Sequence, residues 1–156
     1  MARYTGTVEA PHSPEEVWHY LADLRSVEEW DPSVNEVELV GGEPRTEGAR
    51  YDVEVRFRGR SINLPYRVVE VNPPHQVVFE AETSWVSVRD EAKIEPKGLA
   101  ASSVTWDADL RLRGVRRVLD LPLRASFHRI GEDAKQGLRE RLREPELGGP
   151  IARVRG

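Results

Sequence analysis

The sequence predicts an α+β domain in which a continuous antiparallel sheet wraps around a long C-terminal helix. A short amphipathic helix lies within residues 10–34, and a long one runs from about Val118 to Leu142. The roughly 80 residues between them alternate with the period of strands and have almost no helical period. A helix that follows such a sheet buries its apolar face against it, so the space between helix and sheet is a candidate cavity.

Composition excludes several classes of function. The 156 residues suit one domain with a single core, and the net charge of −4 disfavours nucleic acid as a partner. There is no cysteine, hence no disulfide, thiolate nucleophile or cysteine metal site. No apolar run approaches about 18 residues and no signal-peptide pattern is present, so we expect a cytoplasmic protein that does not span a membrane.

The N-terminal elements have clear start signals. Residues 4–10 alternate weakly and predict a first strand. Ser13-Pro14-Glu15-Glu16 offers a Ser N-cap, a Pro at the first helical position and two acidic groups near the positive end of a helix. The apolar residues that then share one helical face are Val17, Trp18, Leu21 and Leu24. Asp31-Pro32 ends this region.

The central part predicts an antiparallel meander. The further alternating segments are residues 34–39, 51–57, 62–71, 77–81, 86–94 and 104–112. Short turns join them, so we expect about six or seven strands in all. The inward phase within 62–71 is ambiguous, and a β-bulge near Pro65 or at Val68-Val69 would reconcile its two halves.

The last helix carries apolar residues at steps of three and four: Leu119, Leu123, Phe127, Ile130, Ala134, Leu138 and Leu142. Gly131 and Gly137 interrupt it, which predicts either a close backbone approach or room for a ligand. Residues 144–156 contain Pro and Gly without any period, so we expect a flexible tail after a domain of residues 1–143.

Several of these segments resemble the START-related superfamily, and within it the polyketide cyclase/dehydrase and lipid transport (SRPBCC) family. The similarity spans about residues 3–143 and is carried by Ala10-Pro11, Val17-Trp18, Leu21-Ala22-Asp23, Trp30, Pro32, residues 127–134 and Gly137-Leu138. The resemblance implies a helix-grip fold, in which a seven-stranded antiparallel sheet grips the C-terminal helix around a cavity for a hydrophobic small molecule. Members of the family include lipid and sterol carriers, aromatase/cyclases, hormone receptors and proteins that bind a partner chain, and fold alone does not choose among them.

We expect the cavity to bind a hydrophobic or aromatic small molecule noncovalently, for carriage or sensing. Opposed apolar faces that include Ala108, Gly131 and Ala134 leave volume unfilled. The predicted lining is Tyr51, Val53, Val55, Tyr66, Phe79, Val88, Asp90, Trp106, Ala108, Phe127, Ile130 and Ala134.

Asp90 is the strongest single candidate for chemistry. It occupies the inward position between Val88 and Ala92, where a carboxylate would be desolvated and would need a partner. Tyr66 and Arg124 are the expected partners. The alternatives are a shifted strand register, or an edge position that leaves the carboxylate in water.

Other polar and aromatic side chains have a functional and a structural interpretation each. The hydroxyl of Tyr66 suits acid–base or orienting work, and His128, beside Phe127, either faces the cavity or lies on the solvated flank of its helix. Trp106 either donates its indole hydrogen bond to a ligand or packs in the core. Trp30 either caps the cavity mouth or forms a buried hinge between helix and sheet.

Two other functions stay open as alternatives. One is an aromatase/cyclase-like enzyme acting on a polyketide, with Asp90, Tyr66 and His128 as the candidate groups. The other is a protein-interaction module, which a mainly charged outer face disfavours. The sequence has no nucleophile elbow, phosphate loop or dinucleotide motif, and no two histidines share a face at metal-ligand spacing. We therefore expect neither a cofactor nor a metal; the oligomeric state is not determined by the sequence.

Overall fold

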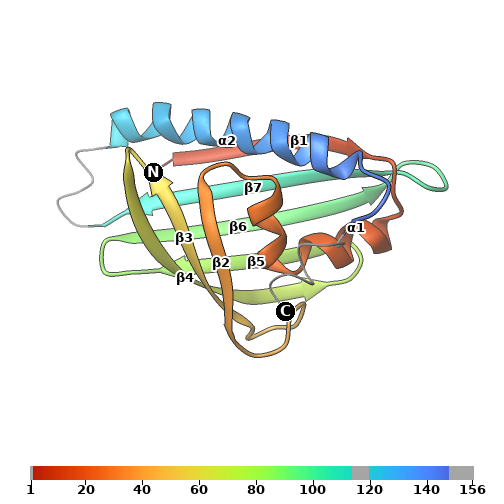
Figure 1. Cartoon of the computed structure of the whole chain (residues 1–156), viewed down its shortest axis with the longest axis horizontal. Coiled ribbons are helices and arrows are strands. Elements are labelled where there is room, and N and C mark those ends of the chain that lie inside the picture. The colour runs from red at the N-terminus through yellow and green to blue at the C-terminus, as the bar shows by residue number, and fades with distance from the viewer. Residues whose placement is uncertain (1, 114–119, 148–156) are drawn as a thin grey trace.

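A seven-stranded antiparallel sheet curves around one long helix, as expected (Figure 1). The computed structural model describes residues 2–113 and 120–147. The elements are β1 (Ala2–Ala10), α1 (Pro14–Leu21), η1 (Leu24–Glu29), β2 (Val34–Gly41), β3 (Arg50–Phe57), β4 (Arg60–Asn72), β5 (Gln76–Glu82), β6 (Val86–Pro96), β7 (Ser102–Leu112) and α2 (Asp120–Leu142). The predicted α+β helix-grip architecture is therefore confirmed.

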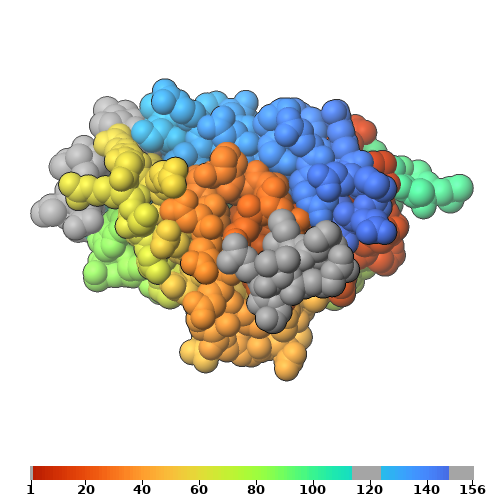
Figure 2. All heavy atoms as spheres, in the orientation of Figure 1, coloured from red at the N-terminus to blue at the C-terminus, as the bar shows by residue number. Residues whose placement is uncertain are grey.

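The first and the last strand of the chain are neighbours in the sheet. Strands β2 to β7 form the predicted meander, and β1 pairs with β7, in register from Ala2 opposite Leu110 to Ala10 opposite Ser102. The order across the sheet is thus β1-β7-β6-β5-β4-β3-β2. In the space-filling view the side chains of α2 meet those of the segment around β2 on one face (Figure 2).

The predicted bulge in β4 is present. Val68 pairs with Phe79 and Glu70 pairs with Val78, so the register shifts by one residue at Val69. This shift keeps buried Val68 on the inner face and changes the phase of the residues that follow, which is the effect of inserting one residue into a strand. Pro65 is exposed and needs no bulge of its own.

The N-terminal helix is shorter than its apolar stripe predicts. The Ser13 side chain accepts the N–H of Glu16 at 3.2 Å, as an N-cap should, but α1 ends at Leu21. Leu24 begins a separate 3₁₀ helix, η1, because the Asp23 carboxylate accepts the backbone N–H of Arg25 at 3.1 Å and so starts a new turn. Placing Leu24 on the first helix was therefore wrong.

Two glycines let α2 lie directly on the N-terminal half of the chain. A Cβ added at Gly137 would lie 1.9 Å from the carbonyl oxygen of Trp30, and one at Gly131 would lie 2.4 Å from the Tyr4 ring. Both distances are far below van der Waals contact. Close backbone approach, one of the two explanations drawn from the sequence, accounts for Gly137, which lies against the Trp30 backbone. Gly131 makes room for the Tyr4 ring and also lines the cavity described below.

A buried ion pair secures the C-terminal end of α2. Arg141 and Glu29 lie 2.5 Å apart with side chains 9% and 5% exposed, and Tyr20 donates its hydroxyl to the same Glu29 oxygen at 3.0 Å. The Arg141 guanidinium also lies 5.1 Å from the centre of the Tyr20 ring. This group links α1, η1 and α2. Arg141 lies 112 positions after Glu29 in the sequence, so no local pattern predicts their contact.

The chain continues past α2 along the surface of the domain. The carbonyl of Glu144 lies 2.7 Å from His12 Nε2, and Arg141 donates to the carbonyl of Glu146 at 3.1 Å. Leu147 packs against the core. The start of the predicted tail thus contacts the domain; residues 148–156 and the predicted helix start at Val118 lie outside the described residues.

We predict that Gly137→Ala destabilises the domain by about 2–3 kcal/mol, because the added methyl group overlaps the Trp30 carbonyl. Helix propensity alone would favour Ala by about 1 kcal/mol, so the sign of the change separates the two effects. Urea unfolding measures it, with Arg129→Ala on the exposed face of α2 as the control. A more stable Gly137→Ala variant would contradict the close approach.

Candidate functional site

A cavity of about 190 Å³ lies between the inner face of the sheet and α2. At about 30 Å³ per water molecule, it is larger than a site for one or two ordered waters. It is smaller than the range of about 300–1,000 Å³ common for drug-sized ligands. Its walls come from β1, η1, the loop before β2, the start of β2, β3, β4, β6, β7 and α2, so residues from most of the fold contribute to it.

Most of the predicted lining lies at this cavity: Val53, Val55, Tyr66, Val88, Asp90, Trp106, Ala108, Phe127, Ile130 and Ala134. Tyr51 and Phe79 do not. Tyr51 is buried under the η1 side of the sheet, where its hydroxyl donates to Asp23 at 3.3 Å. Phe79 is fully buried behind Trp106, whose ring stacks on it at a centroid distance of 6.4 Å. Alternation assigned both to the correct face, but their neighbours in space cover them.

The cavity is also lined by residues that were not among those predicted from the sequence. They are mainly Tyr4, Val8, Leu24, Asp31, Ser33, Phe57, Leu64, Trp85, Leu110 and Leu138. Several belong to the same inward stripes as predicted residues, so periodicity alone could have found Leu110 and Tyr4. Asp31 and Ser33 had no such signal, because a sequence of the type Asp-Pro-Ser indicates only a turn.

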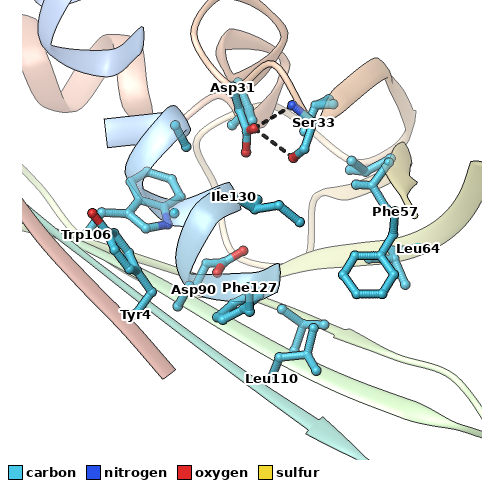
Figure 3. Close-up of a pocket in the computed structure, with 18 of the residues that line it drawn as sticks. Tyr4, Asp31, Ser33, Phe57, Leu64, Asp90, Trp106, Leu110, Phe127 and Ile130 are labelled. Atoms are coloured by element: carbon cyan, nitrogen blue, oxygen red, sulfur yellow. Dashed lines mark hydrogen bonds between the residues drawn. The ribbon is translucent and has the colours of Figure 1, made fainter. Parts of the chain in front are cut away.

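Asp90 lies in the inward register, as predicted, and Tyr66 is its partner. The Tyr66 hydroxyl donates to Asp90 Oδ2 at 3.0 Å. The surface that Asp90 retains faces the cavity, and Figure 3 shows its carboxylate pointing into that space. Arg124, the other expected partner, is exposed and is not among the groups that shift the pKa of Asp90.

Burial raises the pKa of Asp90 from its ordinary value to about 7. Desolvation is the largest cause, and the nearby negative charge of Asp31 adds to it. Hydrogen bonds from Tyr66 and Trp106 act in the opposite direction, because they stabilise the ionised form. A carboxyl group with such a pKa exchanges its proton near neutral pH, which is where a general acid or base is most effective.

Asp31 is a second carboxylate at the same cavity. Its Oδ1 accepts the N–H of Ser33 at 2.9 Å and the Ser33 hydroxyl at 2.7 Å, and both bonds are drawn in Figure 3. Burial raises the pKa of Asp31, the two bonds from Ser33 lower it, and the charge of Asp133 raises it further. In the same view Asp31 and Asp90 lie on opposite sides of the cavity.

His128 does not reach the cavity, contrary to one of the two interpretations of its position. It is exposed on α2, and its ring packs edge-to-face on Tyr4 at a centroid distance of 5.6 Å. Because Ile130 and Phe127 take the inward positions of this turn, His128 falls on the flank. It is therefore removed from the candidates for acid–base chemistry.

Trp30 is both a wall of the cavity and a buried hinge. It is buried, lines the cavity, and meets Trp106 edge-to-face at 5.1 Å. Its carbonyl is the group that touches Gly137. On the opposite side, the Tyr4 hydroxyl donates to Glu132 and so ties β1 to α2 beside the cavity.

Within residues 2–113 and 120–147, no three His, Cys, Asp or Glu side chains gather closely enough to hold a metal ion. In that part of the chain, no helix combines the length and the hydropathy needed to cross a bilayer.

Residues 1–143 match the sequence profile of the family described as polyketide cyclase / dehydrase and lipid transport. The chain therefore belongs to this START-related (SRPBCC) family, as the resemblance in its sequence implied. A curated relative, Toxin Rv0910 of Mycobacterium tuberculosis strain H37Rv, is 26% identical over 111 residues, which cover 70% of this chain and 76% of the relative.

Solved structures agree on the fold. The Zhui aromatase/cyclase from Streptomyces sp. R1128 superposes with a TM-score of 0.76 at 14% identity, covering 90% of this chain and 92% of that one. A START superfamily protein from Mycobacterium smegmatis gives a TM-score of 0.69 at 16% identity, covering 91% and 97%. At such low identity these likenesses show a shared fold and do not assign a ligand or a reaction.

We predict that Asp90→Asn stabilises the protein more at pH 8 than at pH 5. The folded pKa is raised, so the folded state still holds a proton between pH 3.8 and about 7, where the unfolded state has released it, and stability falls as pH rises through that window. About two pH units separate pH 5 from the folded pKa of about 7, and each unit corresponds to about 1.4 kcal/mol, so the gain at pH 8 should exceed that at pH 5 by about 3 kcal/mol. Urea unfolding at both pH values tests this; equal gains would place the carboxylate in water.

We also predict that Tyr66→Phe raises the pKa of Asp90 further, because the lost hydroxyl stabilises the ionised carboxylate. A carbon-13 NMR titration of the Asp side chains measures the change. Tyr51→Phe is the matched control, since its hydroxyl bonds to Asp23 outside the cavity. An unchanged Asp90 titration in Tyr66→Phe would show that the bond is absent in solution.

Proposed function

We propose that the protein binds a hydrophobic or aromatic small molecule noncovalently in the cavity between the sheet and α2. The observation that supports this most directly is the cavity itself: about 190 Å³, lined mainly by aliphatic and aromatic side chains, with carboxylates at a few points. Ligand sites have this composition, because apolar walls supply affinity and a few polar groups fix orientation. Family membership, whose description includes lipid transport, agrees with it.

The test is native mass spectrometry of the purified protein, followed by titration with a panel of lipids and polyphenols. Ala108→Phe, at the cavity wall, should weaken binding of any hit by about tenfold or more, because the larger ring occupies ligand volume. Ala125→Phe on the exposed face of α2 is the matched control and should bind as the parent protein does. Equal affinity in both variants, or no hit in the panel, would contradict the proposal.

A second candidate function is catalysis of the aromatase/cyclase type on a polyketide. The observation in its favour is Asp90, whose pKa of about 7 and contact with the Tyr66 hydroxyl suit proton transfer next to a bound carbonyl. The solved Zhui protein is named as an aromatase/cyclase. If catalysis occurs, Asp90→Asn should abolish product formation from a poly-ketone substrate while binding is retained; a pure carrier would change only in affinity.

The third alternative, a protein-interaction module, has no specific observation in its favour. In the described part of the chain the exposed large hydrophobic side chains are Val40 and Leu99, which belong to β2 and to the loop between β6 and β7. They do not form a continuous apolar patch of the kind that marks a large interface.

A further inference from the structure

We infer that the cavity selects a small hydrophobic amine, whose ammonium group lies between the carboxylates of Asp31 and Asp90 while its apolar part packs on the aromatic wall. The inference rests on the proposed function and names the ligand class of the same site. Three features support it: two carboxylates without a counter-charge, oxygen atoms on them that can accept further hydrogen bonds, and aromatic walls.

Among the residues that the structure describes, neither carboxylate has a basic ion-pair partner. None of the ion pairs formed within residues 2–113 and 120–147 involves Asp31 or Asp90. The basic residues of the lining are Arg56, which is exposed, and Lys135, whose charge acts on Glu132. Burying a carboxylate without a counter-charge is costly, so a cation in the cavity would relieve that cost.

Each carboxylate keeps room for another donor. Both bonds from Ser33 go to Oδ1 of Asp31, and Tyr66 donates to Oδ2 of Asp90. A carboxylate can accept about four hydrogen bonds, and an ammonium group has three donors. The two groups face the cavity from opposite sides in Figure 3, one from the loop before β2 and the other from β6. The charge of Asp31 raises the pKa of Asp90, so the two carboxylates interact across this space, which is where we place the ammonium group.

The walls suit a cation with an apolar body. The aromatic lining residues are Tyr4, Trp30, Phe57, Tyr66, Trp85, Trp106 and Phe127. The faces of such rings attract ammonium groups, most strongly for Trp and in a desolvated site. Trp106 offers an aromatic face to the cavity, and its indole also donates a hydrogen bond to Asp90. An anionic ligand, such as a fatty acid, would be repelled by the same two carboxylates.

The cavity volume limits the size of the ligand. About 190 Å³ is below the usual range for drug-sized molecules, so one ring or two fused rings fit better than a long acyl chain. Naphthylmethylamine, naphthylmethanol and naphthoate have nearly the same shape and differ in charge. They therefore separate the effect of the carboxylates from that of the walls.

The experiment is calorimetric titration of the full chain with these three compounds at pH 8, where the pKa values leave Asp90 mostly ionised. We expect the amine to bind about tenfold or more tightly than the alcohol, and naphthoate to bind most weakly. Equal or tighter binding of the alcohol overturns the amine inference and leaves the proposed function standing. If none of the three compounds binds, the amine inference is overturned as well. The lipid and polyphenol panel then tests the proposed function separately.

Variants show whether the carboxylates cause the preference. Asp31→Asn and Asp90→Asn should each lower amine affinity by about tenfold and change alcohol affinity by less than about threefold. Asp107→Asn is the matched control, because it lies on the same sheet but its side chain bonds to Thr5 outside the cavity. An amine preference that survives both cavity variants would contradict the inference.

A spectroscopic readout separates ligand contact from a structural effect. Binding of the amine should lower the pKa of Asp90 from about 7 toward its ordinary value, since a cation stabilises the ionised form. A carbon-13 titration with and without ligand measures this shift. Binding of the amine with no change in the Asp90 titration would place the ammonium group elsewhere and overturn the assignment.

Discussion

The contact of α2 with the Trp30 carbonyl is the constraint on which the shape of the interior depends. At Gly137 nothing but hydrogen separates the helix from that carbonyl, and at Gly131 the Tyr4 ring takes the place of a side chain. The helix is thereby held close at its C-terminal half, where the Arg141–Glu29 pair also secures it. The helix also forms one wall of the cavity, with Phe127, Ile130, Gly131, Ala134, Lys135 and Leu138.

The polar groups of the cavity are a compromise between desolvation and function. A carboxylate at Asp90 costs stability that an apolar side chain would not, and Tyr66 and Trp106 offset only part of it. A second acid at Asp31, stabilised by Ser33, increases the electrostatic strain. Groups kept at such a cost are characteristic of sites that bind or transform a ligand, whereas the salt bridges on the outer face of the sheet lie in water and contribute little.

The sequence was sufficient for the fold and for much of the cavity wall, because both depend on alternation and on helical period. The phase of β6 placed Asp90 correctly. The phase change in β4 predicted a bulge near Pro65 or at Val68-Val69, and the structure has it at the second of these places. Periodicity gives the face of a residue and not its depth, which is why Tyr51 was assigned to the cavity although it lies under the η1 side of the sheet. The position of Asp31 at the cavity depends on the loop before β2 and on contacts with residues distant in sequence, and a single sequence carries no signal for either.

The pairing of β1 with β7 also bears on how the chain becomes folded during synthesis. Ala2 finds its partner, Leu110, only after most of the domain has been made. During synthesis β1 therefore has no strand partner until the ribosome has produced β7. Only after that can α2 pack on the completed sheet. The sheet is completed only when its last strand has emerged, and the domain only when α2 follows; contacts between such distant parts of a chain slow folding.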